Sequence, residues 1–210
     1  NGKGSTTALL TSILHAAGIR TGMYISPHLV DYPERMTLNG QEISREEFAA
    51  MIGKTRFAAE AIQVQGMESP TEFEVLTAAA FLWFAEKQVE MAVVEVGLGG
   101  LLDSTNVIAP EISVITNVTL EHTDRCGGTV AEIASHKAGI IKTGAPVVTG
   151  ATGEALTVIE AVAARKYSAC SVLNREFFVS DVVIGETEQS FLFSGPAEPP
   201  QRYRMRLLGR

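Results

Sequence analysis

The sequence predicts an α/β protein with an open, mostly parallel sheet, helices on both of its faces, and a small antiparallel β appendage. Three observations lead to this prediction. Strand-like and helix-like segments alternate over residues 5–166, and two of the strand-like runs are apolar and β-branched, as buried parallel strands are. After about Val172 the pattern changes to the alternation of antiparallel strands, with a turn-rich segment among them.

The first predicted element is a helix over residues 5–17, which Gly18 ends. Its apolar residues fall on one face: Leu9, Leu10, Ile13, Leu14 and Ala17. A short strand over residues 21–26 follows. The next segment is predicted to be a long loop with a tight turn at Asn39 and Gly40, because this pair favours left-handed backbone conformations.

Two further helices and a strand complete the first half. Ser44 and Glu47 have the spacing of a capping box and open a helix that ends near residue 63. A second helix over residues 71–87 is apolar almost all round, which predicts that it is buried. Residues 91–96 then form a buried parallel strand.

The second half repeats the alternation before the appendage begins. Strands are predicted over residues 112–117 and 146–149, and a helix over residues 154–166. Thr129 and Glu132 form another capping box, which starts a helix that carries Lys137. The antiparallel appendage covers about residues 172–210.

Composition and charge exclude several classes of function. The formal net charge of -7 argues against a nucleic-acid-binding protein and against binding to an anionic membrane, because both need a basic surface. The longest apolar run, residues 75–85, is too short to span a bilayer. Cys126 and Cys170 have neither metal-binding nor redox spacing, which is typical of reduced thiols in a cytoplasmic protein.

Polar residues lie at or beyond the ends of three of the predicted strands, at the edge where ligands bind to open parallel sheets. Ser26, Glu95 and His122 would bring a hydroxyl, a carboxylate and an imidazole to that edge. Each also has an ordinary structural interpretation: Ser26 as a strand terminator, Glu95 as a salt-bridged residue and His122 as a loop histidine. Lys137 alone would be a solvated helix lysine.

The first six residues resemble the second half of a phosphate-binding loop. Glycines let backbone N–H groups approach phosphate oxygens, the lysine supplies a positive charge, and a hydroxyl can reach Mg²⁺. The residues concerned are Asn1, Gly2, Lys3, Gly4, Ser5 and Thr6. One glycine is inserted relative to the usual G-K-[ST] ending, and a flexible turn is the alternative interpretation.

Together these motifs closely resemble the folylpolyglutamate synthase / dihydrofolate synthase family, within the Mur ligase superfamily of ATP-dependent amide-forming enzymes. The resemblance covers residues 1–148 densely and the rest loosely. The motifs that carry it are NGKGST, YISPHL, the pair Glu34-Arg35, TEFE, VEVGLGG, LDSTNVI, LEHT with His122, and HKAGIIK.

The resemblance implies roles for individual residues. Residues 1–6 would bind ATP; Ser26 and Glu95 would hold one Mg²⁺, and Glu95 and His122 a second. Lys137 matches a lysine that the family carbamylates, and Lys3, Glu95, His122 and Lys137 would form the catalytic set. The residues that would hold the pterin end of the substrate are Thr71, Glu72, Phe73, Glu74, Leu102 and Asp103. The segment SPHLVDYPER resembles a mobile loop that closes over the site.

The function implied by the resemblance is an ATP-dependent ligase that adds L-glutamate to folate or dihydropteroate through an acyl phosphate. Such an enzyme is expected to be a cytoplasmic monomer, with no nucleic-acid or membrane partner. We expect the chain to be an ATPase domain truncated at both ends, without its glutamate-binding domain and inactive alone. Leu101 replaces a common arginine and Glu121 a common aspartate. A cell-wall ligase or a non-catalytic nucleotide-binding module are the alternatives.

Overall fold

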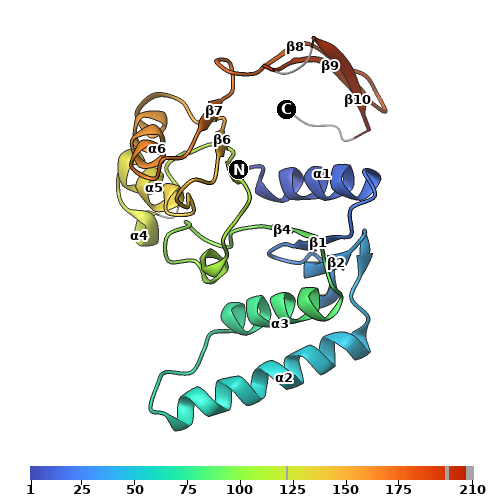
Figure 1. Ribbon diagram of the computed structural model, residues 1–210, viewed down its shortest axis with the longest axis vertical. Helices are drawn as coiled ribbons and strands as arrows, with labels where there is room; N and C mark the ends of the chain where they lie inside the picture. Colours follow the sequence, from blue (N-terminus) through green and yellow to red (C-terminus); the bar gives the residue numbers. More distant parts are fainter. Residues whose placement is uncertain (122, 197–198, 207–210) are drawn as a thin grey trace. The chain divides into compact units, whose positions relative to one another are not determined.

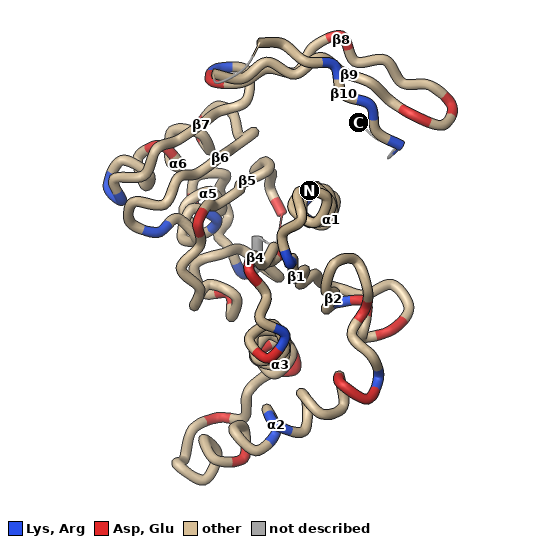
Figure 2. The backbone as a smooth tube through the Cα atoms, turned by 45° about the vertical axis from the view of Figure 1, so that its right-hand side comes forward, with Lys and Arg blue, Asp and Glu red and all other residues tan. Residues whose placement is uncertain are grey.

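A computed structural model of the chain describes residues 1–121, 123–196 and 199–206 (Figure 1). The chain divides into two compact units. The first unit is Gly2–Ile108, and the second unit consists of Asn1 and Ala109–Arg210. Each unit has its own hydrophobic core. Basic and acidic residues are interspersed along the chain (Figure 2).

Most of the predicted helices are present within one or two residues of their expected bounds. The helices are α1 (Lys3–Ala16), α2 (Arg45–Val64), α3 (Glu72–Glu86), α4 (Thr123–Cys126), α5 (Val130–Ala138) and α6 (Gly153–Arg165), with short 3₁₀ helices η1 (Tyr32–Arg35) and η2 (Ser104–Val107). No helix in the described part of the chain is long and apolar enough to cross a membrane.

The strands form three sheets. Their bounds are β1 (Thr21–Tyr24), β2 (Met36–Leu38), β3 (Gln41–Glu42), β4 (Met91–Val94), β5 (Ser113–Ile115), β6 (Val147–Thr149), β7 (Cys170–Val172), β8 (Phe178–Ile184), β9 (Gln189–Ser194) and β10 (Gln201–Met205). The strand orders are β3-β2-β1-β4, β5-β6-β7 and β10-β9-β8. The parallel strands are therefore divided between two sheets.

In the first unit, β1 pairs with β4 in parallel and with β2 in antiparallel orientation, and β2 pairs with β3 in antiparallel orientation. Helix α1 lies on one face of this sheet, α3 lies on the other, and α2 packs on α3 (Figure 1). The α3 side holds the core, in which Tyr24, Met36 and Trp83 are almost fully buried. The predicted long loop was wrong in part, because η1, β2 and β3 lie within it. Its tight turn is confirmed: Asn39 and Gly40 have φ of 51° and 79°.

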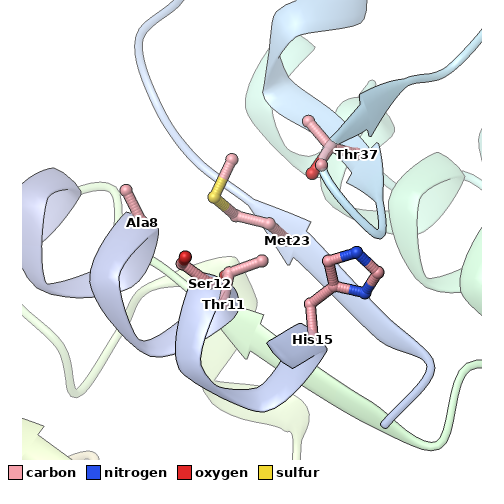
Figure 3. A pocket seen from close by; sticks show the side chains of 7 residues that line it. Ala8, Thr11, Ser12, His15, Met23 and Thr37 are labelled. Carbon is pink, nitrogen blue, oxygen red and sulfur yellow. The ribbon is translucent and has the colours of Figure 1, made fainter. Parts of the chain in front are cut away.

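The contact between α1 and its sheet is more polar than the sequence predicts. The buried residues of α1 are Thr7 and Thr11, whereas Ile13 on the predicted apolar face is 64% exposed. Thr11 donates its hydroxyl to the carbonyl of Thr7 at 2.8 Å, which satisfies it inside the helix. A pocket of about 190 Å³ lies beside this contact (Figure 3), lined by Ala8, Thr11, Ser12, His15, Met23, Thr37 and Gly40.

The second unit contains a fully parallel sheet and the antiparallel appendage. Strands β5, β6 and β7 pair in register, and α5 and α6 pack over a core that includes Val147 and Ile159, both 0% exposed. Strand β7 was not predicted, since a three-residue segment with one β-branched residue gives almost no sequence signal. The predicted appendage is confirmed as β8–β10, in which Phe193 contacts the rings of Phe177 and Tyr203.

Candidate functional site

The N-terminus of α1 has the features of an anion-binding site. Gly2, with a left-handed φ of 82°, is the N-cap residue, and the helix has neither a side-chain cap nor an acidic residue in its first turn. The first N–H groups of a helix lack intrahelical acceptors and carry the positive end of the helix dipole. These groups can therefore bind phosphate oxygens, with Lys3 beside them.

The two candidate hydroxyls of this loop differ in their surroundings. Thr6 donates its hydroxyl to the carbonyl oxygen of Gly2 at 2.8 Å, and its backbone N–H donates to the same oxygen at 3.0 Å. Ser5 is exposed, and its hydroxyl has no hydrogen-bond partner among the described residues. Ser5 is accordingly the hydroxyl that remains available to a ligand, a distinction that the sequence left open.

Glu95 follows β4 and is 8% exposed. Its backbone N–H donates to the carbonyl of Tyr24 at 2.8 Å, and its Oε2 accepts from the backbone N–H of Ser26 at 3.3 Å. A Cβ placed on Gly4 would lie 3.6 Å from Oε2, so the glycine loop runs close to the carboxylate. Because Tyr24 pairs with Val94 in parallel register, the strand ends bring Ser26 and Glu95 together as predicted.

The charge of Glu95 is poorly compensated within the first unit. Burial raises the pKa of its carboxyl, while the Ser26 N–H and the charge of Lys3 oppose that rise only in part. Glu95 forms no ion pair within the described part of the chain, although the structural alternative required one. A buried, unpaired carboxylate next to a serine offers oxygen donors of the kind that Mg²⁺ prefers.

Two other predicted site residues, Asn1 and Lys137, lie in the second unit. Asn1 lies at the end of β5, where its carbonyl accepts from the Thr116 hydroxyl at 2.8 Å and from the Asn117 amide at 3.4 Å. Lys137 lies in the last turn of α5 and is partly buried. His122, the third residue of the predicted edge, lies outside the described residues.

Two of the predicted substrate-binding residues hold the start of a helix. Thr71 and Glu74 form a reciprocal capping box at α3: Glu74 accepts from the backbone N–H and hydroxyl of Thr71 at 2.7 and 2.8 Å. The bond from the Thr71 N–H is the main cause of the lowered pKa of Glu74. The T-x-x-E spacing could have revealed this role from the sequence, as it did at Thr129.

Phe73 and Asp103, two other predicted substrate contacts, support the glycine-rich turn after Glu95. The ring of Phe73 stacks 6.1 Å from that of Tyr24, and a Cβ on Gly97 would come within 2.5 Å of the ring of Phe73. Asp103 accepts from the Leu98 N–H at 2.8 Å and from the Thr105 N–H at 3.0 Å. The turn is thus fixed between an aromatic ring and a carboxylate.

The remaining two predicted substrate contacts are accessible in different ways. Leu102 is 84% exposed, at the tip of the turn that follows the glycines. Glu72 accepts a hydrogen bond from the hydroxyl of Tyr32 at 3.0 Å and so joins α3 to the loop after Ser26. Both side chains are accessible to a ligand, but a ligand of Glu72 would share its carboxylate with the hydroxyl of Tyr32.

The loop expected to be a mobile cover is held by a carboxylate that sequence reasoning missed. Glu34 accepts from the backbone N–H groups of Leu29, Val30 and Asp31 at 2.8, 2.8 and 2.7 Å. These bonds, that of Leu29 first, lower the pKa of Glu34. They support a loop tip at which the side chain of Leu29 is 94% exposed.

Comparisons with known proteins agree with this architecture. The sequence matches the Mur ligase middle domain family over residues 1–210. It is 44% identical over 185 residues to the dihydrofolate synthase/folylpolyglutamate synthase of Bacillus subtilis, a match that covers 84% of this chain. The apo form of L. casei FPGS superposes with a TM-score of 0.94 at 37% identity, covering 100% of this chain and 52% of that one.

A ligand-bound structure is also similar. The FPGS-AMPPCP-folate complex gives a TM-score of 0.88 at 39% identity, covering 92% of this chain and 48% of that chain. The Bacillus match covers 43% of that protein. The chain therefore spans about half the length of the relatives that it matches.

Proposed function

The chain belongs to the Mur ligase middle domain family, and from that premise we propose that it binds ATP for a ligase that adds L-glutamate to a folate. One observation carries the proposal: a buried, unpaired Glu95 lies beside a glycine loop that opens an uncapped helix. The likeness to proteins named for folylpolyglutamate synthesis, one of them solved with AMPPCP and folate, supports the folate branch. Dihydropteroate is the second acceptor proposed.

The phosphate loop performs the first task, binding the nucleotide. Backbone N–H groups at the start of α1 bind phosphate oxygens, and Lys3 adds a positive charge. The left-handed Gly2 lets the backbone turn toward the ligand without the strain that a side chain would add. This arrangement offsets part of the repulsion between a triphosphate and a substrate carboxylate.

Mg²⁺ fits the oxygen donors of Ser26 and Glu95, which form the first proposed metal site. Glu95 and His122 form the second proposed site. Mg²⁺ bound there supplies positive charge that neutralises the phosphates. A carbamate on Lys137 would add a carboxylate-like group; an intact-mass increase of one carbon dioxide, absent in Lys137→Ala, would support it. Lys3, Glu95, His122 and Lys137 are the proposed catalytic residues.

The reaction transfers the terminal phosphoryl group of ATP to the carboxylate oxygen of the folate, and the bond to ADP breaks. The amine of L-glutamate then attacks the acyl carbon, loses a proton, and phosphate leaves. The acyl phosphate must be kept from water, which would otherwise hydrolyse it. The loop supported by Glu34 is the part of the first unit proposed to exclude water. The enzyme is proposed to be a cytoplasmic monomer.

The test is product analysis with the complete gene product that carries this chain. MgATP and L-glutamate are supplied with dihydropteroate in one reaction and tetrahydrofolate in another, and products are identified by mass spectrometry. We expect one glutamyl unit on dihydropteroate, or one or more on tetrahydrofolate, with stoichiometric ADP. Glu95→Gln is the negative control. ATP binding without a glutamyl product in either reaction would contradict the proposal.

A further inference from the structure

Arg35 is a buried cation that the proposed phosphate and metal sites do not use. It ends η1, at the close of the loop that begins with Ser26, and is 9% exposed. Its backbone carbonyl accepts a hydrogen bond from the N–H of Ile25 at 3.0 Å. Arg35 is thereby fixed alongside the end of β1, next to the residue that precedes Ser26.

The guanidinium of Arg35 is held on one edge and one face. Its Nε donates to Nδ1 of His28 at 2.8 Å. Its central carbon lies 5.3 Å from the centroid of the Tyr32 ring, within cation–π distance. The rings of His28 and Tyr32 are themselves 4.5 Å apart. These contacts fix the plane of the guanidinium and leave the edge formed by its two terminal nitrogens.

That remaining edge has no acidic partner among the described residues. Carboxylates of this region are engaged elsewhere. Glu34 accepts from three backbone N–H groups, Asp31 pairs with Arg45, and Glu72 accepts from Tyr32. Asp103, whose charge also acts on Tyr24, accepts from the N–H groups of Leu98 and Thr105. Over residues 1–121, 123–196 and 199–206, Arg35 forms no ion pair, and its terminal nitrogens have no hydrogen-bond partner. Burying a cation without an anion is costly, which makes the edge a strong candidate for an anionic ligand.

The surroundings of Arg35 favour a planar carboxylate on an aromatic molecule. Burial raises the pKa of Tyr24, and its hydrogen bond with Thr77 and the charge of Arg35 oppose that rise, so Arg35 acts electrostatically on Tyr24. The Tyr32 ring, which lies against the guanidinium and is 36% exposed, gives the neighbourhood aromatic surface. Two parallel N–H groups of a guanidinium match the two oxygens of a carboxylate. The phosphates of ATP already have the glycine loop and Lys3.

We propose that Arg35 binds a carboxylate of the folate substrate through its two terminal nitrogens, an assignment that rests on the function proposed above. His28 and Tyr32 are positioning residues, because they orient the guanidinium without needing to touch the ligand. The loop after Ser26 then has two functions. Its exposed tip is the part proposed above to exclude water, and its buried end recognises the charge of the substrate.

Equilibrium binding by the complete protein tests this with three ligands: folic acid, pteroic acid and the neutral carboxamide of pteroic acid. We expect Arg35→Gln to weaken folic acid binding about 10- to 100-fold, the usual loss for a charge-assisted hydrogen-bonded pair, and to change carboxamide binding by less than about 2-fold. Pteroic acid identifies the carboxylate: a similar loss assigns the benzoate group, and no loss assigns the glutamyl group. Arg35→Lys should recover only part of the affinity, because an ammonium lacks the planar fork.

The matched control is Arg45→Gln, which removes an arginine that is 82% exposed and paired with Asp31. It should leave all three affinities unchanged. Equal losses for folic acid and the carboxamide in Arg35→Gln would show a purely structural role and overturn the inference. A loss of AMPPCP affinity with folic acid affinity unchanged would assign Arg35 to phosphate and also overturn it. Failure of the unmodified protein to bind any of the three pterins would instead contradict the proposed function.

Discussion

Two glutamates of the first unit experience opposite environments. Glu95 ends a strand and is buried with one weak backbone donor, at 3.3 Å, and burial raises its pKa. Glu34 lies in a loop and accepts from three backbone N–H groups at 2.7–2.8 Å, which lower its pKa. The difference is that the protein satisfies Glu34 itself, whereas Glu95 is left without an ion-pair partner among the described residues.

This contrast distinguishes a residue that maintains structure from one that we propose to bind a cation. A carboxylate that collects backbone N–H groups stabilises the local fold in its ionised form. A carboxylate that is buried without a partner destabilises the fold when ionised, and such sites persist where a cation binds. Stability and activity should consequently respond in opposite directions when Glu95 is neutralised.

The largest effect is expected for Glu95→Gln. The pKa of Glu95 is higher in the folded state than in the unfolded state. The free energy of unfolding therefore falls as the pH rises from the unfolded pKa to the folded pKa, and it stays at the lower value above the folded pKa. The variant should lose ligase activity by roughly 100-fold or more, as expected when charge stabilisation at the phosphoryl group is removed. Its melting temperature at pH 7, without Mg²⁺ or nucleotide, should rise.

The control for Glu95 is Glu68→Gln, the same chemical change at an exposed position between α2 and α3. This variant should match the unmodified protein in both measurements. A lower melting temperature for Glu95→Gln than for Glu68→Gln would show that Glu95 is a structural residue, and the contrast with Glu34 would be lost.

A smaller effect is expected for Asp103→Asn, which tests the turn that follows Glu95. The N–H groups of Leu98 and Thr105 donate to different oxygens of Asp103, at 2.8 and 3.0 Å. Asparagine replaces one of these oxygens by an NH₂ group, which cannot accept a hydrogen bond, so one of the two bonds is lost. We expect stability to fall by about 1 kcal/mol, which lowers the melting temperature by roughly 2–4 °C in a chain of this size. Activity should fall about 10-fold because the turn positions Glu95. A raised KM for folate at unchanged melting temperature would instead identify Asp103 as a direct substrate contact.

The smallest effect is the acid response of the loop held by Glu34. Its folded-state pKa lies below the ordinary value of 4.5, so its support is fully present above that value and is lost as the pH falls through the folded pKa. The amide resonances of Leu29 and Val30 should titrate together in NMR spectra, with a midpoint below 4.5, and should not do so in Glu34→Gln. A midpoint at or above 4.5 would show that the three backbone bonds do not persist in solution.

Much of the fold could be read from the sequence because its signals are local. The capping box at Thr129 and the pair Asn39-Gly40 act within a few residues, and each occurs where it was predicted. Of the box predicted at Ser44, only the bond from the Glu47 N–H to the Ser44 side chain is present, because the Glu47 carboxylate binds Lys87. Strand β7 and the small strands β2 and β3 could not be found in this way. For β7, the partner strand β6 is separated from it by helix α6. Strands β2 and β3 flank the predicted Asn39-Gly40 turn, but they span only three and two residues, too few to show an alternating pattern.

For the site, the sequence by itself determined the residue types: the glycine loop, a serine and a glutamate after adjacent parallel strands, and the TEFE and LDSTN motifs. Only the tertiary structure decided how those residues are used. It assigned Thr71 and Glu74 to a helix cap, Asp103 to the support of a turn, and Glu34 to the backbone of its own loop. It also left Glu95 and Arg35 buried without a partner of opposite charge among the described residues. A sequence records which groups can form bonds, but burial and the competition among nearby partners determine which bonds form.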